Sequence, residues 1–160
     1  MMNIYTSPVV FLDVDGVLNS IHTIRVTANN YTFVDEKHIL RLKRILDETG
    51  AVVVLSSDWK DGMVDPETRS DLEELRDELL RYGIEITDYT PDDTLFRCRG
   101  TEIEMWLQSH PEVSRFVILD DRADIDPNKD RWVQTYYTEG LTDENADDAI
   151  RILKTVGDDW

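Results

Sequence analysis

The sequence contains little cysteine, little positive charge and no long hydrophobic run. Cys98 is the only cysteine among 160 residues, so an intramolecular disulfide and a cysteine-rich zinc site are excluded. No apolar stretch approaches the ~18 residues of a membrane span, and the first residues lack the basic region of a signal peptide. We therefore expect a cytoplasmic protein that does not associate with membranes.

Positive charge is scarce relative to negative charge. Seventeen Lys and Arg residues stand against 34 Asp and Glu residues, which gives a net charge of −17. Such a charge disfavours a stable coat on nucleic acid and binding to an anionic membrane, since both require basic patches. A polyanionic substrate would approach this protein against its net field.

The length and the apolar content indicate one globular domain over residues 1–160. Of the 160 residues, 41% are hydrophobic. A chain of this size buries enough surface to fold without a disulfide or a structural metal.

Short apolar runs alternate with helical periods along the chain. Three compact runs predict central strands covered on both faces, at residues 8–12, 51–55 and 116–119. Weaker runs at residues 84–87 and 132–137 predict strands nearer the edges. This alternation requires right-handed βαβ crossovers, and it therefore predicts a three-layer, Rossmann-like α/β fold with a mostly parallel five-stranded sheet.

The intervening helices have recognisable ends. Asp35 is placed to cap a helix that stops at Gly50, and a second helix stops near Gly83. Residues 101–104 have the form of a capping box, and the last helix starts near Thr142. Residues 20–34 break the alternation and predict a small hairpin flap after the first strand.

Two acidic residues follow the first strand. In the segment Asp13-Val14-Asp15-Gly16, residues i and i+2 of an extended chain share a face, so both carboxylates point into one site. Gly16 allows the chain to turn away sharply. Because ligands bind at the carboxyl ends of parallel strands, this is the expected functional edge of the sheet.

Two other central strands end in polar pairs. These pairs are Asp120-Asp121 and Ser56-Ser57. Each feature alone is also ordinary turn or N-cap chemistry, but together they predict converging carboxylates that a hard divalent ion, Mg²⁺, neutralises.

These residues resemble the motifs of the haloacid dehalogenase (HAD) superfamily of phosphatases. The segments VVFLDVDGVLN, VVVLSS and VILDD match its first, second and fourth motifs. Short strings from Arg99 onward are most similar to the small HAD domains related to multifunctional RNA-repair proteins. The resemblance implies an HAD-like core and a phosphoric monoester hydrolase that forms an aspartyl-phosphate.

The resemblance also implies a role for each motif residue. Asp13 would be the nucleophile, and Asp15 the general acid and base whose main-chain carbonyl binds the metal. Ser56 would donate to the phosphoryl oxygens, with Ser57 as the alternative. Asp121 would join Asp13 on Mg²⁺, supported by Asp120.

The third motif departs from the family pattern. It is usually a lysine, but no lysine lies between Lys60 and Lys129. Arg99 stands in the expected place, and an arginine supplies the same charge with bidentate phosphate contacts. Arg97 is the rival candidate.

Substrate contacts are expected from residues that flank the motifs, namely Asn19, Ser57, Trp59 and Lys60. Packing of Trp59 under a loop fits its position equally well. The sequence has no room for a large cap, which in this superfamily implies a macromolecular substrate or one presented by a partner. A nucleic-acid end and a phosphoprotein both fit, and the alternatives to turnover are a receiver-like phosphoacceptor and an idle phosphate-binding module.

Overall fold

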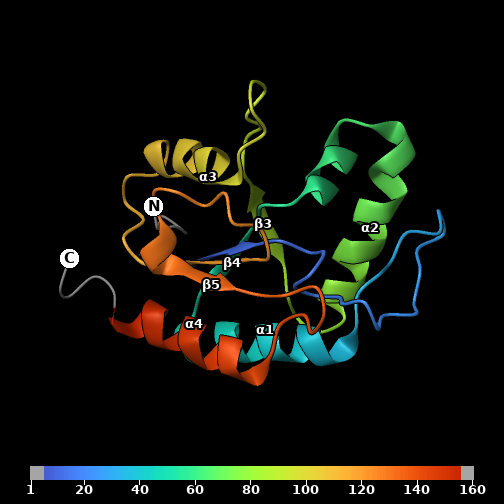
Figure 1. Cartoon of the computed structure of the whole chain (residues 1–160), viewed down its shortest axis with the longest axis horizontal. Helices are drawn as coiled ribbons and strands as arrows, with labels where there is room; N and C mark the ends of the chain where they lie inside the picture. Colours follow the sequence, from blue (N-terminus) through green and yellow to red (C-terminus); the bar gives the residue numbers. More distant parts are fainter. Residues whose placement is uncertain (1–5, 156–160) are drawn as a thin grey trace.

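The fold is built on a five-stranded parallel sheet (Figure 1). The computed structural model describes residues 6–155. The strand order is β3-β2-β1-β4-β5, and each neighbouring pair is parallel. The strands are β1 (Val9–Leu12), β2 (Val52–Leu55), β3 (Ile86–Tyr89), β4 (Phe116–Asp120) and β5 (Trp132–Gln134). The prediction of an α/β sheet of this kind is confirmed.

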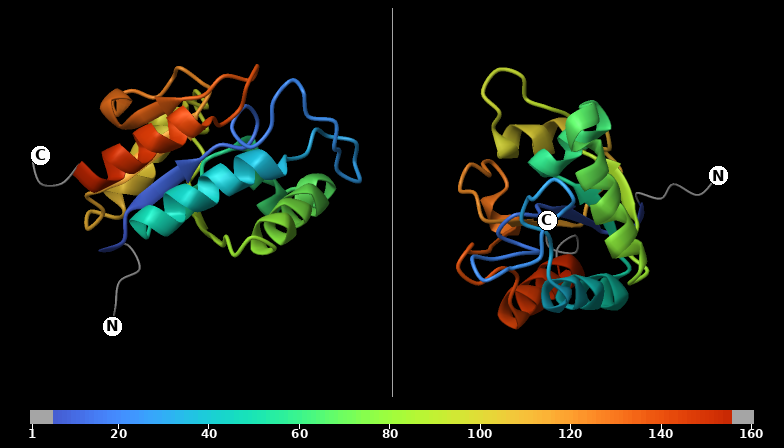
Figure 2. Two further views of the ribbon diagram at one scale, coloured as in Figure 1. Left: turned by 90° about the horizontal axis from the view of Figure 1, so that it is seen from below. Right: turned by 90° about the vertical axis from the view of Figure 1, so that its right-hand side faces the viewer.

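Helices cover both faces of this sheet. Helices α1 (Glu36–Thr49) and α4 (Asp143–Thr155) lie side by side on one face (Figure 2), and α3 (Arg99–Gln108) lies on the other. Helix α2 (Pro66–Leu80) stands at the β3 end of the molecule (Figure 1). Two short 3₁₀ helices, η2 (Asp58–Met63) and η3 (Lys129–Arg131), complete the element order.

Side chains of the central strand alternate between two core clusters. Val10 and Leu12 pack in the cluster that includes α1, α2 and α4, whereas Val9 and Phe11 pack with α3. All four are buried completely, as the unbroken apolar run predicts for a strand covered on both faces. No helix within residues 6–155 has the length and apolar character of a membrane span.

The predicted edge strands differ from the observed ones at their ends. The strand expected at residues 84–87 lies at 86–89, because Ile84 still donates its main-chain N–H to Leu79 of α2. The strand expected at residues 132–137 ends at Gln134, since the chain then turns back and pairs Tyr136 with Gly140.

Two helix ends agree with the prediction and a third does not. Gly50 ends α1 with φ of 73°, and Thr142 exchanges side-chain and main-chain hydrogen bonds with Asn145 before α4. The capping box at residues 101–104 is wrong, because α3 begins at Arg99 after Cys98. The carboxylate of Glu104, the acidic residue of this pattern, instead accepts from the Asn128 side chain at 2.9 Å.

The flap, residues 20–34, forms a narrow hairpin that rests on α2. One antiparallel bridge joins Val26 and Thr32. At its tip, Ala28 donates to Glu74 and Asn29 donates to Ser70, at 3.1 and 2.9 Å. Arg25 forms an ion pair of 2.6 Å with Glu78. The flap is therefore anchored beside the carboxyl edge of the sheet.

Candidate active site

Three carboxylates converge at the carboxyl edge of the sheet. Asp13 follows β1, Asp120 ends β4 and Asp121 comes next. These strands are parallel neighbours, so their ends lie together. Carboxylate oxygens of the three residues lie within 4.8 Å of one another. We call this group the carboxylate cluster.

Arg99 brings a positive charge into the carboxylate cluster. Its Nη1 lies 2.9 Å from Asp120 Oδ2 and 3.3 Å from Asp13 Oδ1, and its side chain is 3% exposed. The same nitrogen donates to the main-chain carbonyl of Ser56. Arg97 is exposed on the preceding loop. The structure thus places Arg99, and not Arg97, against Asp13.

One guanidinium does not balance the carboxylate cluster. Burial, and then the neighbouring Asp13, raise the pKa of Asp120 to about 8 although Arg99 opposes this rise. The same two causes raise the pKa of Asp121 to about 6. Three carboxylates and one guanidinium leave two negative charges, and oxygen ligands are those that Mg²⁺ prefers. The residues present therefore fit a hard divalent cation.

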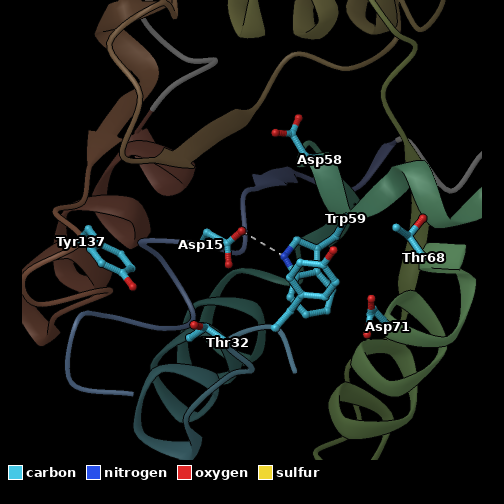
Figure 3. Close-up of a pocket in the computed structure, with 8 residues that line it drawn as sticks. Asp15, Thr32, Asp58, Trp59, Thr68, Asp71 and Tyr137 are labelled. Carbon is cyan, nitrogen blue, oxygen red and sulfur yellow. Dashed lines mark hydrogen bonds between the residues drawn. The ribbon is translucent and has the colours of Figure 1, made fainter. Parts of the chain in front are cut away.

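The Asp15 side chain is not part of the carboxylate cluster but lies on the side of Trp59. Its Oδ1 accepts from Asn19 Nδ2 at 2.9 Å and its Oδ2 from Trp59 Nε1 at 3.1 Å (Figure 3). Desolvation by the surrounding loops raises the pKa of its carboxyl, and these two hydrogen bonds oppose the rise. Asp15 is therefore held at the edge of the site, on the side of Trp59.

The turn after Asp13 is fixed by Asn19 and Gly16. Asn19 is fully buried, where it accepts from the Gly16 N–H at 2.9 Å and donates to the Phe33 carbonyl. Gly16 has φ of 82°, and a Cβ there would lie 2.3 Å from Asp121 Oδ2. Asn19 thus orients the turn and ties it to the flap, whereas we predicted a contact with substrate.

Comparison with protein families matches residues 9–146 to the family described as the HAD domain in Swiss Army Knife RNA repair proteins. The chain belongs to this family. The resemblance deduced from the motifs is confirmed, and HAD domains are generally hydrolases of the phosphatase type. Among curated proteins no match is found.

The two serines after β2 occupy different environments in this HAD domain. Ser56 is buried, and its Oγ has no hydrogen-bond partner among residues 6–155. Ser57 accepts from the Trp59 N–H at 3.3 Å and caps η2. The hydroxyl of Ser56 is thus the one left free for a ligand.

Lys60 does not reach the opening of the site. It is 7% exposed, and its Nζ is surrounded by oxygens of Thr90, Pro91, Asp92 and Glu102 at 3.0 to 3.2 Å. Its predicted role as a substrate contact therefore has no support in the structure. Lys60 instead ties η2 to the loop before α3.

A cavity of about 500 Å³ lies next to Asp15. Its walls come from the flap, η2, α2 and the loop after β5 (Figure 3), and include Tyr31, Trp59, Asp71 and Tyr137. We call it the aromatic cavity. Of these four residues only Trp59 is predicted from the sequence to contact substrate, because the cavity joins segments whose proximity no local pattern reveals.

Proposed function

We propose that this HAD domain is a Mg²⁺-dependent phosphatase that hydrolyses a phosphomonoester through an aspartyl-phosphate on Asp13. The observation that carries the proposal is that the Asp13 carboxylate lies against the buried guanidinium of Arg99 and within 4.8 Å of carboxylate oxygens of Asp120 and Asp121. A nucleophile of this kind needs positive charge on both sides, because a phosphoryl group cannot otherwise approach it.

In the first step, an Asp13 carboxylate oxygen attacks phosphorus and the bond to the ester oxygen breaks. Asp15 gives its proton to the departing oxygen, and its raised pKa favours the protonated form that this step requires. Arg99 and the free Ser56 hydroxyl hold the phosphoryl oxygens.

In the second step, water attacks the aspartyl-phosphate, Asp15 takes the proton of that water, and phosphate leaves with Asp13 regenerated. The carboxylate cluster would hold the divalent cation, which would supply positive charge against the phosphoryl oxygens.

The substrate class that we propose is the phosphate end of a nucleic acid. The description of the family, a domain of RNA repair proteins, supports it. The site lies at the carboxyl edge of the sheet beside a flap of only residues 20–34, so a chain end can reach it. A phosphoprotein is the competing substrate class.

The test is a screen of phosphate-ended oligonucleotides, phosphopeptides and phosphorylated metabolites, with Mg²⁺ and with chelator. We expect Mg²⁺-dependent phosphate release that Asp13→Asn abolishes. The matched control is Asp61→Asn, an aspartate of η2 outside the carboxylate cluster, which should retain activity.

Two outcomes would contradict the proposal. Appreciable turnover by Asp13→Asn would exclude the covalent mechanism. Stoichiometric phosphorylation of the protein without release of phosphate would identify a receiver-like phosphoacceptor.

In Asp15→Asn, fluoride-type phosphate mimics should still bind while turnover falls.

A further inference from the structure

The aromatic cavity has the composition of a site for a flat, uncharged ring. Tyr31 comes from the flap, Trp59 from η2 and Tyr137 from the loop after β5. Tyr31 and Tyr137 are 59% and 44% exposed, so their rings are accessible from the cavity that they line together with Trp59. Aromatic side chains of this kind stack on nucleobases irrespective of base identity.

The charges of the cavity exclude an anionic occupant. The ionisable residues that line it, within the described chain, are Asp15, Asp58 and Asp71 together with the two tyrosines, and no lysine or arginine is among them. A phosphate or a phosphodiester would therefore be repelled from the cavity. The group that enters must be uncharged or cationic, and it must offer hydrogen-bond donors.

Asp71 supplies an unused acceptor in the α2 wall of the cavity (Figure 3). The residue is 5% exposed. Its Oδ2 accepts a long hydrogen bond of 3.3 Å from Asn29 of the flap, whereas Oδ1 has no partner anywhere in residues 6–155. A buried carboxylate oxygen without a donor is unfavourable, and a ligand N–H in the cavity would relieve it once the Asp71 carboxylate turns toward the cavity, because Oδ1 is covered in this structure.

The position of the cavity links it to the leaving group. Asp15 lines the cavity with its carboxylate and follows the nucleophile Asp13 by two residues. Trp59 both lines the cavity and donates to Asp15 at 3.1 Å. A group that leaves from a phosphoryl on Asp13 and receives the Asp15 proton would thus extend into the aromatic cavity.

We propose that the aromatic cavity binds the nucleobase of the nucleotide that carries the phosphate. The proposal rests on the phosphatase function proposed above and specifies its substrate. About 500 Å³ lies within the range of small-ligand sites and suits a base better than a single lysine or arginine side chain. Because carboxylate oxygens accept hydrogen bonds, Asp71 suits a base with N–H donors, and guanine presents two of them side by side, at N1 and at its exocyclic amine.

The first experiment compares nucleoside 3′- and 5′-monophosphates with ribose 5-phosphate, which lacks the base. We expect kcat/KM for the better nucleotide series to exceed that for ribose 5-phosphate by about tenfold or more, as base stacking contributes elsewhere. Tyr137→Leu and Tyr31→Leu should each remove most of this advantage, because they should lower kcat/KM for the nucleotide much more than for ribose 5-phosphate.

The matched control is Tyr136→Leu. Tyr136 is the neighbour of Tyr137 and is 57% exposed, but it does not line the aromatic cavity. This variant should behave like the unaltered protein on both substrates. Asp71→Asn should specifically reduce the preference for guanine over the other bases.

A second experiment separates this proposal from the phosphatase function. Guanosine is titrated by calorimetry into Asp13→Asn, which needs no turnover, and into Asp13→Asn with Tyr137→Leu. Binding that Tyr137→Leu weakens supports the cavity even if no substrate is hydrolysed. If nucleotides and ribose 5-phosphate are hydrolysed equally well and guanosine does not bind, the aromatic cavity does not bind a nucleobase, although the phosphatase function stands. A preference for phosphopeptides with a neighbouring lysine or arginine would overturn it as well.

Discussion

Replacing Arg99 with alanine tests the buried charge arrangement most directly. The guanidinium is 3% exposed and lies within ion-pair distance of both Asp13 and Asp120. Breaking a buried ion pair from one side typically costs about 3–5 kcal/mol, because the remaining charge stays buried without compensation. In a protein of this size about 1 kcal/mol corresponds to about 2–4 °C, so we expect a loss of about 10 °C in Tm without Mg²⁺.

The same change removes a fixed charge from the phosphoryl site. Loss of one preorganised contact of this kind lowers kcat by about 10²- to 10³-fold elsewhere, and we expect a similar loss in kcat/KM. Arg99→Lys should recover part of the lost activity, because the ammonium retains the charge but not the bidentate geometry of the guanidinium. Arg97→Ala, at an exposed loop position, is the control. Calorimetry and phosphate-release assays give the two readouts.

A double variant tests whether the stability lost in Arg99→Ala comes from the uncompensated charge of Asp120. Asp120→Asn introduced together with Arg99→Ala removes a carboxylate that the single change leaves uncompensated. The double variant should therefore be more stable than Arg99→Ala alone. If it is no more stable, the cost of losing Arg99 comes from packing. If instead Arg97→Ala impairs catalysis and Arg99→Ala does not, the phosphate-binding cation has been assigned two residues away from its true position.

Other outcomes follow from the site. Ser56→Ala should leave Tm unchanged and lower kcat, because the hydroxyl is buried without a partner, whereas Ser57→Ala should lower Tm by a few degrees since it removes the η2 cap. The raised pKa of Asp121, about 6, means that the folded protein binds more protons than the unfolded chain above the ordinary value of 3.8. The Tm of the Mg²⁺-free protein should therefore fall as pH rises from 4 to 7, and the fall should be smaller in Asp121→Asn. Asp13→Asn should raise Tm without Mg²⁺, since it removes one of the crowded negative charges. On a phosphate-ended oligonucleotide, kcat/KM should change by less than about threefold over a fourfold change in salt, as expected for one phosphate contact at most.

Much of the fold could be predicted because its signals are local. The apolar runs mark the central strands, and a parallel arrangement brings the residues after β1, β2 and β4 to one edge without further information. Asp13, Ser56 and Asp120 are therefore found at that edge. The ends of β3 and β5 were less predictable, since they depend on where α2 ends and where the chain turns back at Tyr136.

The walls of the site were less predictable, since they depend on contacts between distant segments. Lys60 follows the second motif, and this position predicts a contact with substrate. In the structure, however, Glu102, 42 residues later, binds the Lys60 ammonium in the interior of the protein. The capping-box pattern failed for a similar reason, because Asn128, 24 residues later, donates to the Glu104 carboxylate. Tyr31, Asp71 and Tyr137 meet only because the flap docks on α2, and no periodicity in their own segments indicates this.

The distribution of charge around the site favours recognition of a chain end over recognition of a strand. Arg25 of the flap and Arg122 of the loop after β4 are paired with Glu78 and Asp124, at 2.6 and 2.5 Å. Paired guanidiniums release few counterions, so a phosphodiester backbone gains little by lying across this surface. In the function proposed above, affinity for a nucleic acid would come from its terminal phosphate at Arg99 and the cation, and from its terminal base in the aromatic cavity. An end is the part of a strand that offers both groups together, and loss of the phosphate removes one of them, which favours release of the product.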